Sequence, residues 1–167
     1  VKELAEKLGA SVSGFSEGYI VKGDTDDYLI CEDKSANRAG LTALQIDTSK
    51  ANFEQAVAEA NLLLNFNNDL SLSYSEVDLV KLLKDTKSVA FSSHDTQTSA
   101  LASLAVPVAS YSEYAGSVIN CDNVLQYFAK AVSKNNDQLD IVAIAAQLGS
   151  PLQTQADCFN ALKPFIN

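Results

Sequence analysis

The stretch LLLNFNNDLSLSYSEVDLVKLLKDTKSVAF, residues 62–91, decides the fold. It begins and ends with apolar runs, residues 62–64 and 88–91, of the kind found in strands that are covered on both faces. The segment between them has helical spacing. A helix that joins two buried strands favours their parallel pairing, because the chain must cross over the sheet before the second strand begins.

The connecting helix has a recognisable start. Ser73 and Glu76 fit a capping box, in which a hydroxyl and a carboxylate bind the free N–H groups of the first turn. Regularly spaced apolar residues predict the inner side of this helix: Val77, Val80 and Leu83.

Before this unit we expect two helices and a strand. Residues 2–8 have helical spacing, and Gly9 follows where a helix usually ends. Residues 41–46 form an apolar run that predicts a first strand. Residues 51–60 predict a helix with these residues on one face: Phe53, Ala56, Val57 and Ala60.

An excursion rich in glycine and aspartate occupies residues 14–33. Its β-prone segments, residues 19–21 and 28–30, predict two short strands around a turn or a surface loop. We expect the excursion to be the most mobile part of the chain, because it combines glycines with carboxylates that repel one another.

After the central unit, residues 99–104 predict a short helix and residues 104–109 another strand. Three helices are expected to close the chain. Asp122 caps the first, Gly149 ends the second and Pro164 ends the last. The apolar residues of the first of these helices are Val124, Leu125, Phe128 and Val132.

Together these elements predict an α/β, Rossmann-like three-layer domain with a mostly parallel sheet and a helical C-terminus. No repeat and no linker rich in Pro, Gly and Ser divides residues 1–167, so we expect a single domain. The chain contains no methionine, not even at position 1, which indicates a piece excised from a longer protein.

The charge balance excludes some classes of partner. Of the 167 residues, 12 are Lys or Arg and 21 are Asp or Glu, for a net charge of −9. Such a chain repels a polyanion, so we expect no nucleic-acid partner. No apolar run approaches the roughly 20 residues of a membrane-spanning helix, so we expect no direct membrane insertion.

Motifs for metals and nucleotides are missing from the sequence. Cys31, Cys121 and Cys158 are widely and irregularly spaced, which indicates reduced intracellular thiols rather than a disulfide framework, a zinc site or an iron–sulfur site. The glycine-rich loops that bind NAD and nucleoside triphosphates do not occur. We therefore predict no metal ligand and no catalytic residue in this chain.

One short pattern suggests a hydrolase. Residues 14–18 match G-x-S-x-G, with Ser16 as the nucleophile and His94 as the one possible imidazole base. A β-prone stretch follows the serine, whereas that motif needs a helix there, so we reject the hydrolase.

A cluster of carboxylates in the excursion has the chemistry of a calcium site. Its spacing lacks the glycine of a calcium loop at the sixth position, and Ser35 stands in place of the bidentate glutamate at the twelfth. We interpret the cluster as a solvated acidic loop. Its members are Asp24, Asp26, Asp27, Glu32 and Asp33.

A longer likeness covers most of the chain and is best over residues 60–150. Residues 96–123, TQTSALASLAVPVASYSEYAGSVINCDN, resemble a segment of the molybdopterin oxidoreductase superfamily with the motifs T-E-T-A, A-D-V-V-L-P and T-x-x-N-x-E-G. Residues 140–149 are similar to the family's next helix, and residues 37–40 to its N-x-x-G step. The matching positions in the first segment are Pro107, Glu113, Gly116, Asn120 and Asp122.

Within that superfamily the chain most resembles the C-terminal, molybdopterin-oxidoreductase-like region of the large peripheral subunit of bacterial NADH-quinone oxidoreductases (respiratory complex I). The resemblance implies a domain that keeps the fold of the cofactor enzymes and has lost the cofactor, with iron–sulfur clusters elsewhere in the parent protein. Three family positions have lost their charge here, as Gln97, Ser103 and Val124. The remaining groups would be vestigial cofactor-binding candidates: Asp95, Thr96, Thr98 and Asn120.

The function implied by the resemblance is that of a scaffold or accessory domain without a redox cofactor. Its partners would be other subunits and domains of the peripheral arm, on the cytoplasmic side of the bacterial inner membrane. Two alternatives stay open. One is a fragment of an active molybdopterin-dependent oxidoreductase, such as a formate dehydrogenase-like enzyme, and the other is a protein-interaction module unrelated to respiration.

Overall fold

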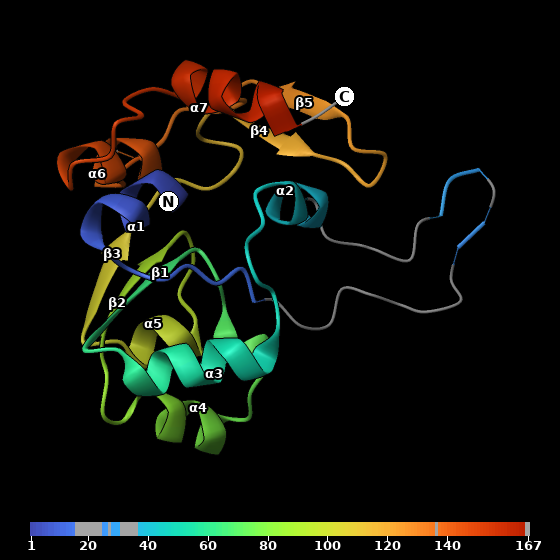
Figure 1. Ribbon diagram of the computed structural model, residues 1–167. Helices are drawn as coiled ribbons and strands as arrows, with labels where there is room; N and C mark the ends of the chain where they lie inside the picture. The colour runs from blue at the N-terminus through green and yellow to red at the C-terminus, as the bar shows by residue number, and fades with distance from the viewer. Residues whose placement is uncertain (16–24, 27, 31–36, 136, 166–167) are drawn as a thin grey trace.

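The computed structural model describes residues 1–15, 25–26, 28–30, 37–135 and 137–165. Its centre is a three-stranded parallel sheet with the strand order β1-β2-β3 (Figure 1). The α/β class, the parallel sheet and the helical C-terminus expected from the sequence are therefore confirmed.

The sheet is built from two successive strand–helix–strand units. Its strands are β1 (Leu62–Phe66), β2 (Lys87–Ser92) and β3 (Leu104–Pro107). Helix α4 (Glu76–Leu83) connects the first two strands, and α5 (Gln97–Leu101) connects the last two. Each helix returns the chain to the starting end of the sheet, as parallel pairing requires.

Helices on one side of the sheet enclose a first core. Helices α3 (Lys50–Glu59), α4 and α5 lie together on this side (Figure 1). Leu63 of β1 packs against this core from the sheet. The buried residues of the first core are Phe15, Phe53, Val57, Leu70, Leu79 and Leu83.

A second core lies on the opposite face of the sheet, beneath α6 (Ile141–Gln147). The strand register places Phe66, Phe91 and Val106 in one row across the three strands. The rings of Phe66 and Phe91 stack with centroids 4.6 Å apart, and Ile144 of α6 is buried with Phe91 in this core. Helix, sheet and helix therefore form three layers.

The rest of the described chain adds an antiparallel hairpin and flanking helices (Figure 1). At Gly116 a Cβ atom would lie 2.5 Å from Cζ of Phe128 on the opposite strand, so a larger residue here would displace that ring. These further elements are α1 (Lys2–Leu8), α2 (Arg38–Ala43), η1 (Leu70–Leu72), β4 (Gly116–Ile119), β5 (Leu125–Phe128), α7 (Gln155–Leu162) and η2 (Lys163–Phe165).

The predicted strand at residues 41–46 is wrong. These residues continue α2 and end in a turn, with Leu44 N–H donating to Gly40 O (3.0 Å) and Gln45 at a φ of 56°. A short apolar run fits either structure by its pattern alone. Here helix α2 packs beside β4.

The predicted helix after Asp122 is also wrong. Leu125–Phe128 form β5, which pairs with β4 in the register Ile119 to Leu125 and Gly116 to Phe128. The apolar spacing from Val124 to Phe128 is compatible with one helical turn, but pairing with a neighbouring strand outweighs such a local pattern.

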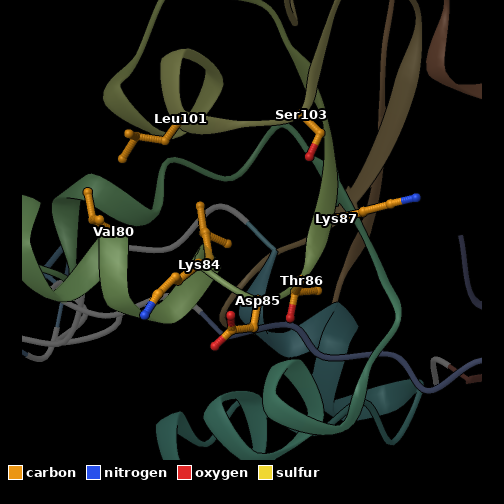
Figure 2. A pocket seen from close by; sticks show the side chains of 8 residues that line it. Val80, Lys84, Asp85, Thr86, Lys87, Leu101 and Ser103 are labelled. Carbon is orange, nitrogen blue, oxygen red and sulfur yellow. The ribbon is translucent and has the colours of Figure 1, made fainter.

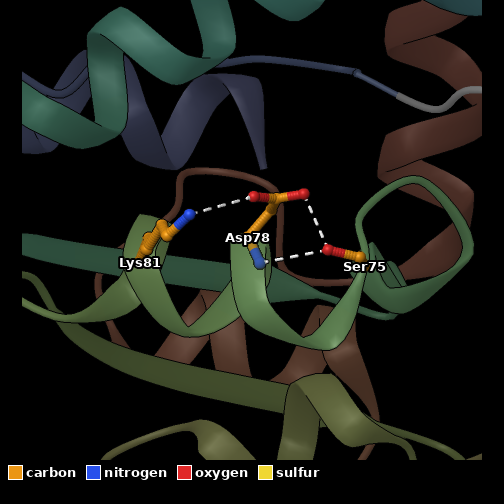
Figure 3. Close-up of polar contacts among 3 residues, drawn as sticks. All are labelled: Ser75, Asp78 and Lys81. Carbon is orange, nitrogen blue, oxygen red and sulfur yellow. Dashed lines mark hydrogen bonds and ion pairs between the residues drawn. The ribbon is translucent and has the colours of Figure 1, made fainter.

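The predicted helix between β1 and β2 exists, but it begins two residues later than the capping box suggested. The Ser75 hydroxyl accepts from Asp78 N–H (3.2 Å) and donates to the Asp78 carboxylate (2.7 Å), which also pairs with Lys81 at 3.6 Å (Figure 3). The predicted inner face is right for Leu83, which is buried, and wrong for Val77 and Val80, which are exposed. Leu79 is buried in their place.

Only part of the excursion belongs to the described residues. Residues 28–30 form no strand, since the N–H groups of Tyr28, Leu29 and Ile30 all donate to one carboxylate oxygen of Asp26. Residues 19–21 lie outside the described residues, so the expected strand there and the expected mobility of the excursion stay predictions.

In the described part of the chain, no helix has both the length and the apolar character needed to cross a membrane. The longest of the helices in these described ranges is α3, with 10 residues, and a spanning helix needs roughly 20.

Among the residues that the structure describes, four carboxylates have a pKa below the usual range because hydrogen-bond donors stabilise their charged form. The Ser49 backbone N–H lowers the pKa of Asp47, and the Ser75 hydroxyl lowers that of Asp78. The pKa of Glu113 is lowered mainly by the Ser110 N–H, and that of Asp157 mainly by the Thr154 hydroxyl. Three of these carboxylates, Asp47, Asp78 and Asp157, lie at helix starts.

These shifts predict a loss of stability in acid. In the unfolded chain the same carboxyl groups bind protons more readily, so their contribution is complete above about pH 5 and is lost as the pH falls through the folded pKa values. Urea unfolding measured as a function of pH tests this. The variant Asp47→Asn keeps an acceptor for the Ser49 N–H and cannot titrate. Its free energy of unfolding should therefore fall less steeply in acid than that of the parent protein. An equally steep fall in this variant would contradict a contribution of Asp47 to the loss of stability in acid.

Candidate functional site

The carboxyl ends of the three parallel strands meet at one edge of the sheet, which is where ligands bind in open α/β sheets. Three loops leave this edge, at residues 67–69, 93–96 and 108–113. We call these loops the carboxyl edge. Asp95 and Thr96 lie on it and Thr98 lies in the first turn of α5 that follows, so the sheet brings three of the four sequence-predicted candidates together.

Thr98 binds the protein itself. It is buried, and its hydroxyl donates to Asp69 Oδ1 (2.9 Å) and lies 3.3 Å from Ser71 N. The same Asp69 oxygen accepts from the N–H (3.1 Å) and the hydroxyl (2.7 Å) of Ser71. Thr98 therefore ties the loop after β2 to the loop after β1.

The other two candidates on this edge differ in their roles. Thr96 is the N-cap of α5: its hydroxyl accepts from Ser99 N–H (3.0 Å), while the Ser99 hydroxyl accepts from Thr96 N–H (2.9 Å). This is a capping box, which satisfies backbone donors at the helix start. Asp95 is exposed to solvent.

The link through Thr98 has a measurable effect on stability. The variant Thr98→Val keeps the side-chain shape but removes the hydroxyl that Asp69 and Ser71 share, so we expect the free energy of unfolding to fall by about 1.5 kcal/mol. Thr42→Val, at an exposed position of α2, is the matched control. Equal urea midpoints for the two variants would contradict a structural role for the Thr98 hydroxyl.

A second cluster on the carboxyl edge was not predicted from the sequence. Asn67 follows β1 with a φ of 51°, a conformation that asparagine tolerates better than most residues. Its side-chain oxygen accepts from Ser93 N–H (3.1 Å) and the Ser93 hydroxyl (2.9 Å). The Ser93 hydroxyl also lies 2.9 Å from His94 Nδ1. In the sequence, the polar run that directly follows β1 could have indicated this cluster.

Asn120, the fourth candidate, lies in the turn of the β4–β5 hairpin. Its side-chain oxygen accepts from Asp122 N–H (3.0 Å) and Val124 N–H (2.9 Å), and its own N–H donates to Val124 O (3.1 Å). The side chain closes the turn, as asparagine commonly does. Its hydrogen bonds belong to this turn and not to the carboxyl edge.

Gln97, Ser103 and Val124, the three positions where the resembled family carries a charged residue, lie in different parts of the structure. Ser103 and Ser88 bind one another reciprocally, each hydroxyl accepting from the other residue's N–H (3.2 and 3.4 Å). This pair lies where β2 and β3 begin, at the opposite end of the sheet from the carboxyl edge. Gln97 is exposed at the start of α5, and Val124 is exposed in the hairpin turn.

Two rejected sites fall partly on residues that are not described. Ser16 lies outside the described residues, and so does most of the acidic cluster. His94, the other half of the rejected hydrolase pair, is exposed beside Ser93. Among the described residues, no group of three metal-ligating side chains comes together. Four members of the acidic cluster lie outside the described residues: Asp24, Asp27, Glu32 and Asp33.

The described cysteines occupy different environments. Cys121 is exposed in the β4–β5 turn, whereas Cys158 is half-buried in α7. Burial raises the pKa of the Cys158 thiol, which keeps it protonated at neutral pH. Cys31 lies outside the described residues.

Comparison with known proteins adds no assignment: no family model matches the chain, and no curated protein matches it.

Proposed function

We propose that this chain is a scaffold domain of a longer protein, the large peripheral subunit of a bacterial NADH-quinone oxidoreductase, and that it carries no redox cofactor itself. Its role is to hold neighbouring domains and subunits of the peripheral arm in place. The protein would then lie on the cytoplasmic side of the inner membrane, bound there through its complex.

One observation carries the non-catalytic part of this proposal. The candidate cofactor-binding groups Thr96, Thr98 and Asn120 already serve as a helix cap, a bond between loops and a turn closure. A pterin nucleotide carries a pyrophosphate, which needs cationic or free N–H donors. A cofactor could bind the Thr98 hydroxyl only if the hydrogen bond to Asp69 broke, and the stabilising free energy of that buried bond would then be lost.

Positions that carry the family resemblance support the same view. Glu113 accepts from Ser110 N–H (2.8 Å) and so holds the loop after β3. Gly116 makes room for the ring of Phe128. Such roles explain why these residue types would persist in a domain that keeps a fold and has no cofactor to bind.

The test combines location and composition. A tagged form of the chain is expressed in the bacterium that makes it, and solubilised membranes are separated on a native gel stained for NADH oxidation. The tag should migrate with the NADH-oxidising band, and the purified chain should hold far less than one molybdenum, iron or pterin per molecule. A tagged unrelated soluble protein is the control.

Two outcomes would overturn the proposal in different ways. Stoichiometric molybdenum and pterin would assign the chain to an active molybdopterin-dependent oxidoreductase. A tag that migrates apart from every NADH-oxidising band would assign it to an assembly unrelated to respiration.

A further inference from the structure

Strand β5 forms one edge of the β4–β5 hairpin, and no described strand pairs with its other side (Figure 1). Ile119 N–H of β4 donates to the Asn37 side chain (2.9 Å) and therefore points away from β5. Ile119 and its partner Leu125 thus exchange no hydrogen bonds, and such pairs alternate along an antiparallel ladder. The N–H and C=O groups of Leu125 and Tyr127 therefore point outward from β5.

This outer edge is open and carries none of the usual protection. Within the described residues, the outward groups of Leu125 and Tyr127 have no hydrogen-bond partner. The strand is accessible, since Gln126 is exposed and Tyr127 is 58% exposed. Proteins usually protect a sheet edge with charged residues, proline or a bulge. The sequence of β5, LQYF, has no charge and no proline, and its register with β4 is unbroken.

The other edges of the described sheets are better protected. On β4 the Asn37 side chain occupies the N–H of Ile119. Strand β3 ends in Pro107, which has no N–H, and the chain directly after it pairs with Leu139. In β1 every residue after Leu62 is partly buried. Of these edges, β5 is therefore the one most open to another chain.

The cleft of about 360 Å³ between α4 and α5 lacks such a directional signal. Val80 and Leu101 point toward one another on one side of it (Figure 2). Lys84 and Asp85 carry opposite charges beside it, and Lys87 extends away from the aliphatic pair (Figure 2). Its lining therefore favours no class of partner over another, whereas the backbone groups of β5 select an extended strand.

We propose that β5 pairs antiparallel with β5 of a second copy of this chain, so that the two hairpins form one four-stranded sheet. The two-fold axis passes between the two Gln126 residues. Leu125 of each copy then lies opposite Tyr127 of the other, and each of these two pairs exchanges two hydrogen bonds. This register satisfies every outward N–H and C=O group of Leu125 and Tyr127 in both copies. Such an interface uses the same surface on both subunits.

The side chains of β5 complement one another in this register. On one face Leu125 lies beside Tyr127 of the other copy, and on the opposite face Val124, which is 51% exposed, lies beside Phe128. Apolar and aromatic pairs across neighbouring strands stabilise a sheet. The two Gln126 amides meet at the axis, where each has both a donor and an acceptor. Helix α7 packs mainly against β4, so it leaves the β5 edge accessible.

The charges beside the strand favour a second copy as the occupant. Asp122 and Lys130 lie four residues before and four residues after Gln126, so the same register brings Lys130 of each copy toward Asp122 of the other. Both side chains are exposed, and neither forms an ion pair with a described residue. These two contacts oppose the repulsion between copies that each carry a net charge of −9.

The dimer should be weak, because one short strand from each copy makes an interface smaller than that of stable complexes. It should therefore form only at high protein concentration, and more readily when salt screens the repulsion between the two acidic chains. The interface depends on the β5 edge alone, so failure of the respiratory assignment leaves this proposal intact.

The test measures association of the full chain and locates the interface. In sedimentation experiments the average mass should rise toward that of two chains as the concentration increases. Over the same range, NMR hydrogen exchange should slow at the amides of Leu125 and Tyr127. The amides of Gln126 and Phe128 already face β4, so they are internal controls whose exchange should change much less.

Substitutions at the axis distinguish a second copy from any other occupant. Gln126→Glu and Gln126→Lys should each weaken the dimer about fivefold, because either charge would face itself across the axis. An external strand would discriminate between the two charges. The matched controls Gln97→Glu and Gln97→Lys change an exposed glutamine on α5 and should leave association unchanged.

A charge exchange tests the register. Lys130→Glu should weaken the dimer about fivefold, because the new carboxylate would face Asp122 of the other copy. Adding Asp122→Lys to this variant should restore the affinity. Lys84→Glu makes the same change of net charge on α4's side of the molecule and is the control. Circular dichroism checks that each variant is folded.

Three results would overturn this proposal. The chain could remain monomeric at every concentration, or it could associate without slower exchange at Leu125 and Tyr127, which would place the contact on another surface. Finally, Gln126→Lys could strengthen association while Gln126→Glu weakens it, which would exclude a two-fold axis at Gln126.

Discussion

Phe91→Ala is expected to lower the free energy of unfolding by about 4 kcal/mol, because Phe91 is the centre of the second core. Its side chain is buried, stacks on Phe66 and lies in the row that runs across all three strands to Val106. Ile144 of α6 is buried in the same core. Loss of the ring should therefore loosen α6 as well as the sheet.

Two measurements check this result. Urea unfolding gives the free energy, and hydrogen exchange of the α6 amides should become faster in Phe91→Ala than in the parent protein. Tyr111→Ala, which truncates an aromatic residue that is 75% exposed, serves as the control and should change stability by less than about 0.5 kcal/mol. If α6 exchange is unaffected, α6 does not depend on this face of the sheet for its stability.

Leu79→Ala should lower the free energy of unfolding by about 3 kcal/mol, since Leu79 is 0% exposed in the first core. Its neighbours come from η1, α3 and α4, so they cannot all move inward to fill the space left behind. For a chain of this length the change corresponds to a melting temperature about 9 °C lower.

The control for this substitution lies on the same helix. Val77→Ala removes an exposed side chain two residues away from Leu79 and should change the melting temperature by less than about 2 °C. Comparable losses in the two variants would mean that α4 packs on the sheet by a different face.

Much of the fold could be predicted from local patterns. The apolar runs at residues 62–64 and 88–91 became β1 and β2, and the helical spacing of residues 51–60 became α3. Gly9 has a φ of 64° at the end of α1, as expected for a glycine that terminates a helix. These signals succeed because each depends on neighbours within a few residues.

The failures share one physical cause. Residues 41–46 and 125–128 have apolar spacings that fit either a helix or a strand over so short a length. Whether Leu125 enters a helix or pairs with Ile119 depends on a strand that the local pattern does not reveal. The choice of Leu79 rather than Val77 as an inner residue likewise depends on how α4 is rotated against the sheet.

The candidate site was predictable in part. Asp95, Thr96 and Thr98 were singled out by the resemblance, and the sheet does bring them to one edge. Their hydrogen bonds could not be foreseen, because the partner of Thr98 is Asp69, 29 residues earlier in the chain. Asn120 was grouped with them, whereas its hydrogen bonds close a hairpin turn.

By itself, the sequence determined the alternation of strands and helices and the parallel order of the central sheet, since both follow from apolar spacing and from the length of the crossovers. Tertiary structure alone decided which face of each helix is covered and which polar groups are bound by other loops. Burial and loop-to-loop hydrogen bonds join residues distant in the chain, and only the folded arrangement places Thr98 against Asp69 or leaves Val80 and Leu101 exposed beside Lys84.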